Sequence, residues 1–103
     1  MNEFVILLHR LTDEPFSEEA VRAHVDRLAE LDDEGRLVLA GPMGDGTGGL
    51  VVARFADEDA AQAFADSEPF VTGGWETATV HPWIRADRSN DYLDPTLPER
   101  RGR

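Results

Sequence analysis

The alternation of apolar and polar residues along the first 84 positions predicts four β-strands and two α-helices in the order β-α-β-β-α-β. Ser17 is the expected N-cap of the first helix and Gly35 its stop, because glycine tolerates the left-handed conformation that ends a helix. Asp57 is the expected cap of the second helix, whose pattern is broken at Pro69. The expected strands are residues 3–10, 37–40 (cut by Gly41-Pro42), 50–55 and 75–83, and the expected helices are residues 17–35 and 58–67.

This order of elements indicates an α+β protein with a ferredoxin-like fold, a four-stranded antiparallel sheet that carries both helices on one face. The first strand, Glu3–Arg10, is a near-continuous apolar run, so the sheet face away from the helices also needs cover. A large exposed apolar face is unusual in a monomer. We therefore expect a homodimer that is joined through sheet faces.

Composition narrows the possible partners of the chain. The 103 residues have a formal net charge of −11, so the protein repels phosphate backbones and nucleic-acid binding is not expected. No apolar run is long enough for a membrane span and no basic leader is seen, so we expect a cytoplasmic protein.

Residues 1–84 form the expected domain. Residues 85–103 are expected to form a tail that is either mobile or laid over the dimer partner, with Tyr92 and Leu93 as its anchor.

The first helix contains the most informative residue of the chain, His24. Val21, Val25, Leu28 and Leu31 follow the spacing of a core-facing stripe, and His24 is expected to point between the last two of them. An inward-facing imidazole needs either a hydrogen-bonding partner or a cavity. The helix pattern is compatible with both a core histidine bonded to a backbone carbonyl and a functional base.

The other motifs of the chain give weaker indications of a functional site. The glycine-rich stretch 44–49 lacks the lysine of a phosphate-binding loop and joins two strands, so we expect a flexible hairpin at the edge of a pocket. The chain has no cysteine, and its histidines lack metal-binding spacing, so neither metal nor cofactor is expected. Arg10 and Arg22 are candidates for holding an anionic substrate or for surface ion pairs. His9 and His81 lie on strands and face either the sheet cavity or solvent.

A series of short motifs closely resembles the YciI-like (YCII-related domain) family over about residues 3–84. The resemblance implies the ferredoxin-like fold and its dimerisation into an α+β barrel. It also implies a dyad of the helix histidine, here His24, with an acidic residue that is usually aspartate and is Glu68 in this chain. The matching segments are Arg22-x-His24-x-x-x-Leu28, Asp33-Glu34-Gly35-Arg36-Leu37, Ala40-Gly41-Pro42, Ala60-Ala61-x-Ala63, Ser67-Glu68-Pro69-Phe70-Val71-x-x-Gly74 and His81-Pro82-Trp83.

The resemblance implies a cofactor-free lyase or isomerase, because some relatives are dehydrochlorinases of chlorinated hydroxyquinol-type aromatics. Glu68 is expected to hold one ring nitrogen of His24, while the other moves a proton on a small phenolic or lactone-like substrate. The residues expected to bind this substrate are His9, Arg22, Gly41, Pro42, Asp45 and Phe70. The rival hypothesis is a dimeric module that binds a small molecule or a partner without turnover.

Overall fold

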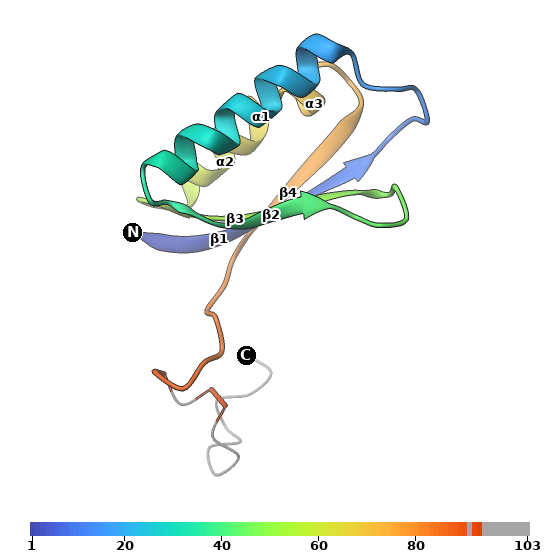
Figure 1. Ribbon diagram of the computed structural model, residues 1–103. Helices are drawn as coiled ribbons and strands as arrows, with labels where there is room; N and C mark the ends of the chain where they lie inside the picture. Colours follow the sequence, from blue (N-terminus) through green and yellow to red (C-terminus); the bar gives the residue numbers. More distant parts are fainter. Residues whose placement is uncertain (91, 94–103) are drawn as a thin grey trace.

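The computed structural model describes residues 1–90, 92 and 93 as a four-stranded sheet with its helices on one side (Figure 1). The long helix α1 and the shorter α2 lie side by side above the sheet, and α3 follows α2 directly (Figure 1). The elements in chain order are β1 (Asn2–Arg10), α1 (Glu18–Asp33), β2 (Leu37–Pro42), β3 (Gly48–Phe55), α2 (Glu58–Asp66), α3 (Pro69–Thr72) and β4 (Glu76–Pro82).

The sheet has the strand order β2-β3-β1-β4, and every neighbouring pair is antiparallel. The two longest apolar strands, β1 and β3, are therefore central, and β2 and β4 form the edges. This arrangement confirms the expected α+β class and is consistent with a ferredoxin-like fold.

The core lies between the sheet and the helices. Phe4, Ile6 and Leu8 alternate along β1 and are each at most 5% exposed, as the period of two in a strand requires. Their partners across the sheet and on the helices complete one apolar cluster. The other buried members are Leu31, Val51, Ala53, Phe55, Ala61 and Ala65.

The helix boundaries follow the local signals in the sequence. The Ser17 hydroxyl accepts the Ala20 amide at 3.1 Å, and the Asp57 carboxylate accepts the Ala60 amide at 2.8 Å. Gly35 has a φ of 72° just beyond the end of α1. The predicted caps of both helices and the stop of the first helix are therefore confirmed.

Two features of the chain differ from expectation. Strand β2 continues through Gly41 and Pro42, which pair with Leu50 and Gly49, whereas the sequence predicted a break there. A proline is tolerated at this position because β2 is an edge strand. Pro69, predicted only to break a helix, also begins the short helix α3, where proline fits the first turn.

The apolar stripe of α1 is only half buried, which corrects the expectation of a continuous core-facing stripe. Leu31 is 4% exposed, whereas Val21 and Val25 are 40% and 54% exposed. Both valines line a cavity between α1 and the β2–β3 side of the sheet. The N-terminal half of the stripe therefore faces a space that residues 1–90, 92 and 93 do not fill.

The sheet face opposite the helices carries apolar side chains from three strands. Leu39, Val52 and Val5 are partners in register across β2, β3 and β1, and Leu50 pairs with Leu7 in the next row. Val52 is buried, Val5, Leu7 and Leu50 are half-buried, and Leu39 is 51% exposed. We call these five residues the open face.

Candidate functional site

His24 and Glu68 form a close pair although 44 positions separate them. His24 Nδ1 lies 2.7 Å from Glu68 Oε1. The His24 side chain is 18% exposed and the Glu68 side chain is 2% exposed. The hydrogen bond expected from the family resemblance is therefore present, while a catalytic role for the pair remains a prediction.

Glu68 is held in place by the start of α3, which explains how a carboxylate becomes so deeply buried. Its side chain caps this helix by accepting the Phe70 amide, and Pro69 begins the helix. Its second oxygen, Oε2, lies 3.4 Å from Arg27 Nη1. Arg27 also donates to the Phe64 carbonyl and the Ser67 hydroxyl, each at 2.8 Å. The buried charge thus has three hydrogen-bonding partners, as burial demands.

Flat side chains stack in a column beside this pair. The His24 and Phe70 rings have centroids 4.4 Å apart, and the Phe70 and Phe16 rings are nearly parallel at 3.8 Å. The Arg10 guanidinium lies 4.1 Å from the centroid of Phe16 and closes the column. Stacking together with the Glu68 contact fixes both the plane and the rotation of the imidazole.

His24 lines a cavity of about 350 Å³ between α1 and the sheet. This volume is within the range of small-molecule sites. The lining is almost wholly apolar, and His24 and Glu76 are its two titratable side chains. The lining residues are Leu8, Phe16, Val21, His24, Val25, Leu28, Ala40, Gly41, Pro42, Gly48, Gly49, Leu50, Val51, Phe70 and Glu76.

The β2–β3 hairpin forms one wall of this cavity, with Gly41, Pro42, Gly48 and Gly49 among the lining residues. Gly48 has a φ of +152°, and a Cβ built there would lie 1.7 Å from the Leu8 carbonyl oxygen. Only glycine therefore permits this approach of the hairpin to β1. The expectation that the glycine-rich hairpin edges a pocket is confirmed.

Glu76 is the unexpected residue of the cavity. It is 4% exposed, and its Oε1 has no hydrogen-bonding partner among the described residues. Loss of solvent raises the pKa of the Glu76 carboxyl above its ordinary value, and the charge of Glu68 adds to this effect. Arg10, His24 and His9 act in the opposite direction but do not outweigh burial.

We expect Glu76→Gln to stabilise the protein at neutral pH by about 1 kcal/mol, because a buried carboxyl group without a hydrogen-bonding partner must either carry a buried charge or hold its proton above its ordinary pKa. A folded-state pKa above 4.5 means that the folded protein retains a proton that the unfolded chain loses. The wild type should therefore lose stability as the pH rises from about 4.5 through the raised pKa, whereas the glutamine variant should not lose this contribution. Urea unfolding of both proteins between pH 4 and pH 8 measures the difference, and parallel curves would contradict the prediction.

Three of the expected substrate-binding residues lie outside the cavity. Arg22 is on the solvent side of α1, where it pairs with Glu18 at 3.4 Å. His9 is exposed and belongs to the face of β1 opposite the helices, because Leu8 and Arg10 take the helix side. Asp45 sits in the hairpin turn and accepts hydrogen bonds from the amide and hydroxyl of Thr47. Gly41, Pro42 and Phe70 do line the cavity.

Sequence reasoning missed Phe16, Arg27 and Glu76. A signal for Glu76 was present, because it shares the period-two face of β4 with Ala78 and Val80, a face otherwise directed at the core. Arg27 lies one helical turn after His24, so its position near the same partner was also within reach. No local pattern links Phe16 to Phe70, and only the fold brings these rings together.

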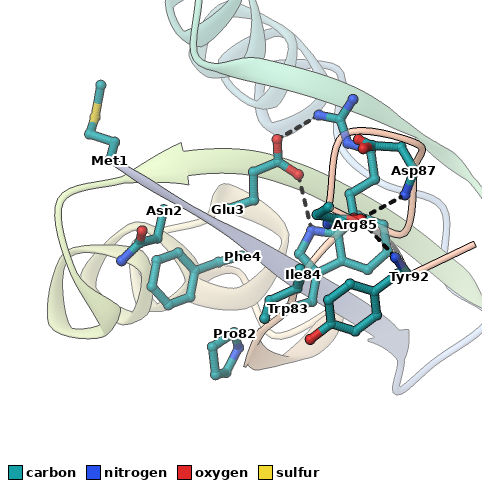
Figure 2. A pocket seen from close by; sticks show the side chains of 11 residues that line it. Met1, Asn2, Glu3, Phe4, Pro82, Trp83, Ile84, Arg85, Asp87 and Tyr92 are labelled. Atoms are coloured by element: carbon teal, nitrogen blue, oxygen red, sulfur yellow. Dashed lines mark hydrogen bonds and ion pairs between the residues drawn. The ribbon is translucent and has the colours of Figure 1, made fainter. Parts of the chain in front are cut away.

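A second hollow, of about 900 Å³, lies beside the start of β1 and the segment after β4. Figure 2 shows Glu3 between Arg85 and the indole of Trp83, which lie 2.5 and 3.3 Å from its carboxylate oxygens. Arg54 approaches the same carboxylate at 3.5 Å. The polar groups of this hollow therefore largely satisfy one another. Tyr92, an expected anchor of the tail, also lines it, and residues 91 and 94–103 of that tail lie outside the described residues.

Within the described part of the chain, no cluster of three or more His, Asp or Glu residues is arranged to hold a metal ion. Over the same residues, no helix is both long and apolar enough to cross a membrane.

A family model described as the YCII-related domain matches residues 3–84. The chain belongs to this family. Protein YciI of Escherichia coli is 43% identical over 72 residues, which cover 59% of this chain and 74% of that protein. The uncharacterized protein YjpA of Bacillus subtilis is 30% identical over 80 residues, which cover 78% of this chain and 94% of that protein.

Among solved structures, 5-chloro-2-hydroxyhydroquinone dehydrochlorinase (TftG) of Burkholderia phenoliruptrix superposes with a TM-score of 0.65. The two proteins are 20% identical, and the match covers 82% of this chain and 95% of that one. The neighbouring structure is a complex with 2,5-dihydroxybenzoquinone. At this identity the likeness shows a common fold.

Proposed function

We propose that this member of the YCII-related domain family is a cofactor-free lyase that acts on a small single-ring compound in the cavity beside His24. The 2.7 Å contact between His24 Nδ1 and Glu68 carries the proposal. A carboxylate only accepts hydrogen bonds, so the imidazole hydrogen belongs on Nδ1. The neutral ring then presents the lone pair of Nε2 as a base.

The surroundings of His24 suit proton transfer to a bound ring. No hydrogen-bonding partner of Nε2 occurs among residues 1–90, 92 and 93, so this nitrogen is available to a ligand. The apolar lining of the cavity favours a flat and mostly apolar molecule, and a volume of about 350 Å³ accommodates one six-membered ring with small substituents. Stacking on Phe70 holds the base in one orientation while the substrate reacts.

Elimination of hydrogen chloride is the reaction that these groups support best. In the keto form of a chlorinated hydroxyquinol, one ring carbon carries both hydrogen and chlorine. Removal of a hydroxyl proton by Nε2 lets that oxygen form a carbonyl, shifts a double bond and expels chloride with the C–Cl electron pair. The sum is loss of HCl to give a hydroxyquinone, which needs a base but no external oxidant.

The substrate named for the dehydrochlorinase that shares this fold supplies a direct assay. Purified protein mixed with 5-chloro-2-hydroxyhydroquinone should release chloride faster than buffer alone, as measured with a chloride electrode under anaerobic conditions. A rate equal to that of buffer, with the compound bound, would favour the rival function, a binding module without turnover.

We also propose that the protein is a homodimer that buries the open face against a second copy. Leu39, Val52 and Val5 form one apolar row across three strands, and Leu50 and Leu7 form the next. The helices cover only the other side of the sheet (Figure 1). A sheet with both faces apolar is stable when both are covered, and a second identical sheet supplies that cover most simply.

Light scattering at micromolar concentration should report about 23 kDa, twice the chain mass of 11.4 kDa. Leu7→Glu, which places a charge in the middle of the open face, should give a monomer because burying an unpaired carboxylate is costly. Ala29→Glu adds the same charge to an exposed position of α1 and should leave the dimer intact. A wild type that scatters as an 11.4 kDa particle would overturn the proposal.

A further inference from the structure

We propose that Glu76 is the second working group of the cavity and donates a hydrogen bond from its carboxyl group to a carbonyl or phenolic oxygen of the substrate. The inference rests on the proposed function, because it assigns a further catalytic residue to the same cavity. It also defines the substrate class as rings that carry an oxygen acceptor in addition to an ionisable hydroxyl.

The position of Glu76 places its side chain inside the protein. It is the first residue of β4 and pairs with Arg10 of β1 on the helix side of the sheet. It is 4% exposed and lines the same cavity as His24. Glu76 therefore borders the same cavity as the proposed base.

The carboxyl of Glu76 is not used by the fold itself. Its Oε1 is buried without a hydrogen-bonding partner among the described residues. The Arg10 guanidinium, the nearest candidate in register, instead donates to the carbonyls of Thr12 and Glu14 and stacks on Phe16. An unsatisfied buried polar group costs stability, so its presence in a cavity indicates a partner that arrives with a ligand.

The burial of Glu76 favours the protonated form of its carboxyl group. Burial is the largest cause of its raised pKa, and the neighbouring carboxylate of Glu68 acts in the same direction. Arg10, the second largest cause, favours the ionised form, as do His24 and His9, but together they do not outweigh burial. A carboxyl that keeps its proton is a hydrogen-bond donor, whereas an ionised one is only an acceptor.

Glu76 and His24 therefore offer one ligand a hydrogen-bond donor and a proton acceptor, respectively. Nε2 of a neutral His24 accepts a proton, and the Glu76 carboxyl donates a hydrogen bond, while the remaining lining is apolar. In the proposed elimination, the donor stabilises the carbonyl oxygen of the keto form while the base removes the hydroxyl proton. The best match is a hydroxylated cyclic enone or quinone.

The experiment measures the dissociation constant of 2,5-dihydroxybenzoquinone by calorimetry between pH 5 and pH 9, for the wild type and Glu76→Gln. The amide still donates a hydrogen bond but does not titrate. We expect wild-type binding to weaken toward tenfold per pH unit once Glu76 ionises, relative to the variant. Because both proteins bind the same quinone, ionisation of the ligand cancels in the ratio of the two constants.

Glu30→Gln removes one exposed carboxylate from α1 and should give a constant ratio to the wild type over the same range. A constant ratio for Glu76→Gln as well, or no binding of the quinone by the wild type, would overturn the inference. A pH-dependent ratio in a protein that releases no chloride would support the role of Glu76 and refute only the lyase. Chloride release with a constant ratio would refute only the role of Glu76.

Discussion

Replacing His24 by glutamine should lower the rate of chloride release by about 10²–10⁴-fold, the usual contribution of a general base. Glutamine retains a hydrogen-bond donor that reaches toward Glu68 but has no nitrogen lone pair to take a proton. Because the imidazole borders a cavity, its removal should leave the protein folded, with a shift in unfolding free energy of about 1 kcal/mol. Steady-state kinetics and urea unfolding on the same preparation measure both effects.

His81→Gln is the matched control for this substitution. His81 is exposed, and its Nε2 lies 3.1 Å from the Thr79 hydroxyl on the face opposite the cavity. Its replacement should leave the rate of chloride release within about twofold of wild type, because it touches no group of the site. Equal rates for His24→Gln and wild type would exclude His24 as the base, and a loss of more than about 3 kcal/mol of stability would favour a core histidine.

Glu68→Ala should have the largest effect on stability, a loss of about 3 kcal/mol together with loss of activity. The substitution removes the partner of His24 at 2.7 Å, the partner of Arg27 at 3.4 Å and the cap of α3. Arg27 keeps its bonds to the Phe64 carbonyl and the Ser67 hydroxyl, which limits the cost of leaving its charge unpaired. Urea unfolding at pH 7 measures the change in stability.

Two further variants separate the causes of this loss. Glu30→Ala removes an exposed carboxylate from α1 and should change stability by less than about 0.5 kcal/mol. Glu68→Asp keeps the charge but shortens the side chain by one methylene, so it should recover part of the stability while loosening the contact with His24. If Glu68→Ala were as stable as the wild type, the pair would contribute nothing to the fold.

Local signals in the chain determined the elements of the fold and most of their ends. The helix caps at Ser17 and Asp57 and the left-handed conformation of Gly35 depend on contacts within three or four residues. Such short-range contacts can be predicted directly from the sequence. The apolar run of residues 3–10 likewise indicated a strand with apolar side chains on both faces, and the structure places it at the centre of the sheet. Pro42 was misread because tolerance of proline depends on whether a strand lies at an edge, and this is a property of the whole sheet.

The candidate site could be predicted only in part from the sequence pattern. The helical pattern singled out His24, but its partner Glu68 lies 44 positions away and was found through the family resemblance, since no periodicity spans that distance. Arg22, His9 and Asp45 have suitable chemistry, but the fold turns them to solvent or to the other face of the sheet.

The sequence by itself determined the chain order of the four strands and the two longer helices, the class of the fold and the presence of one unusual histidine, but it did not predict α3. Only the tertiary structure decided that Val21 and Val25 border a cavity and that Glu76 is buried beside it, with its Oε1 unpartnered among the described residues. The cavity could not be predicted because a hydrophobic pattern indicates only which side of a helix or strand is apolar. Whether an unfilled space is left depends on the distance between the packed elements. That separation is set by the packing of side chains that are distant in sequence.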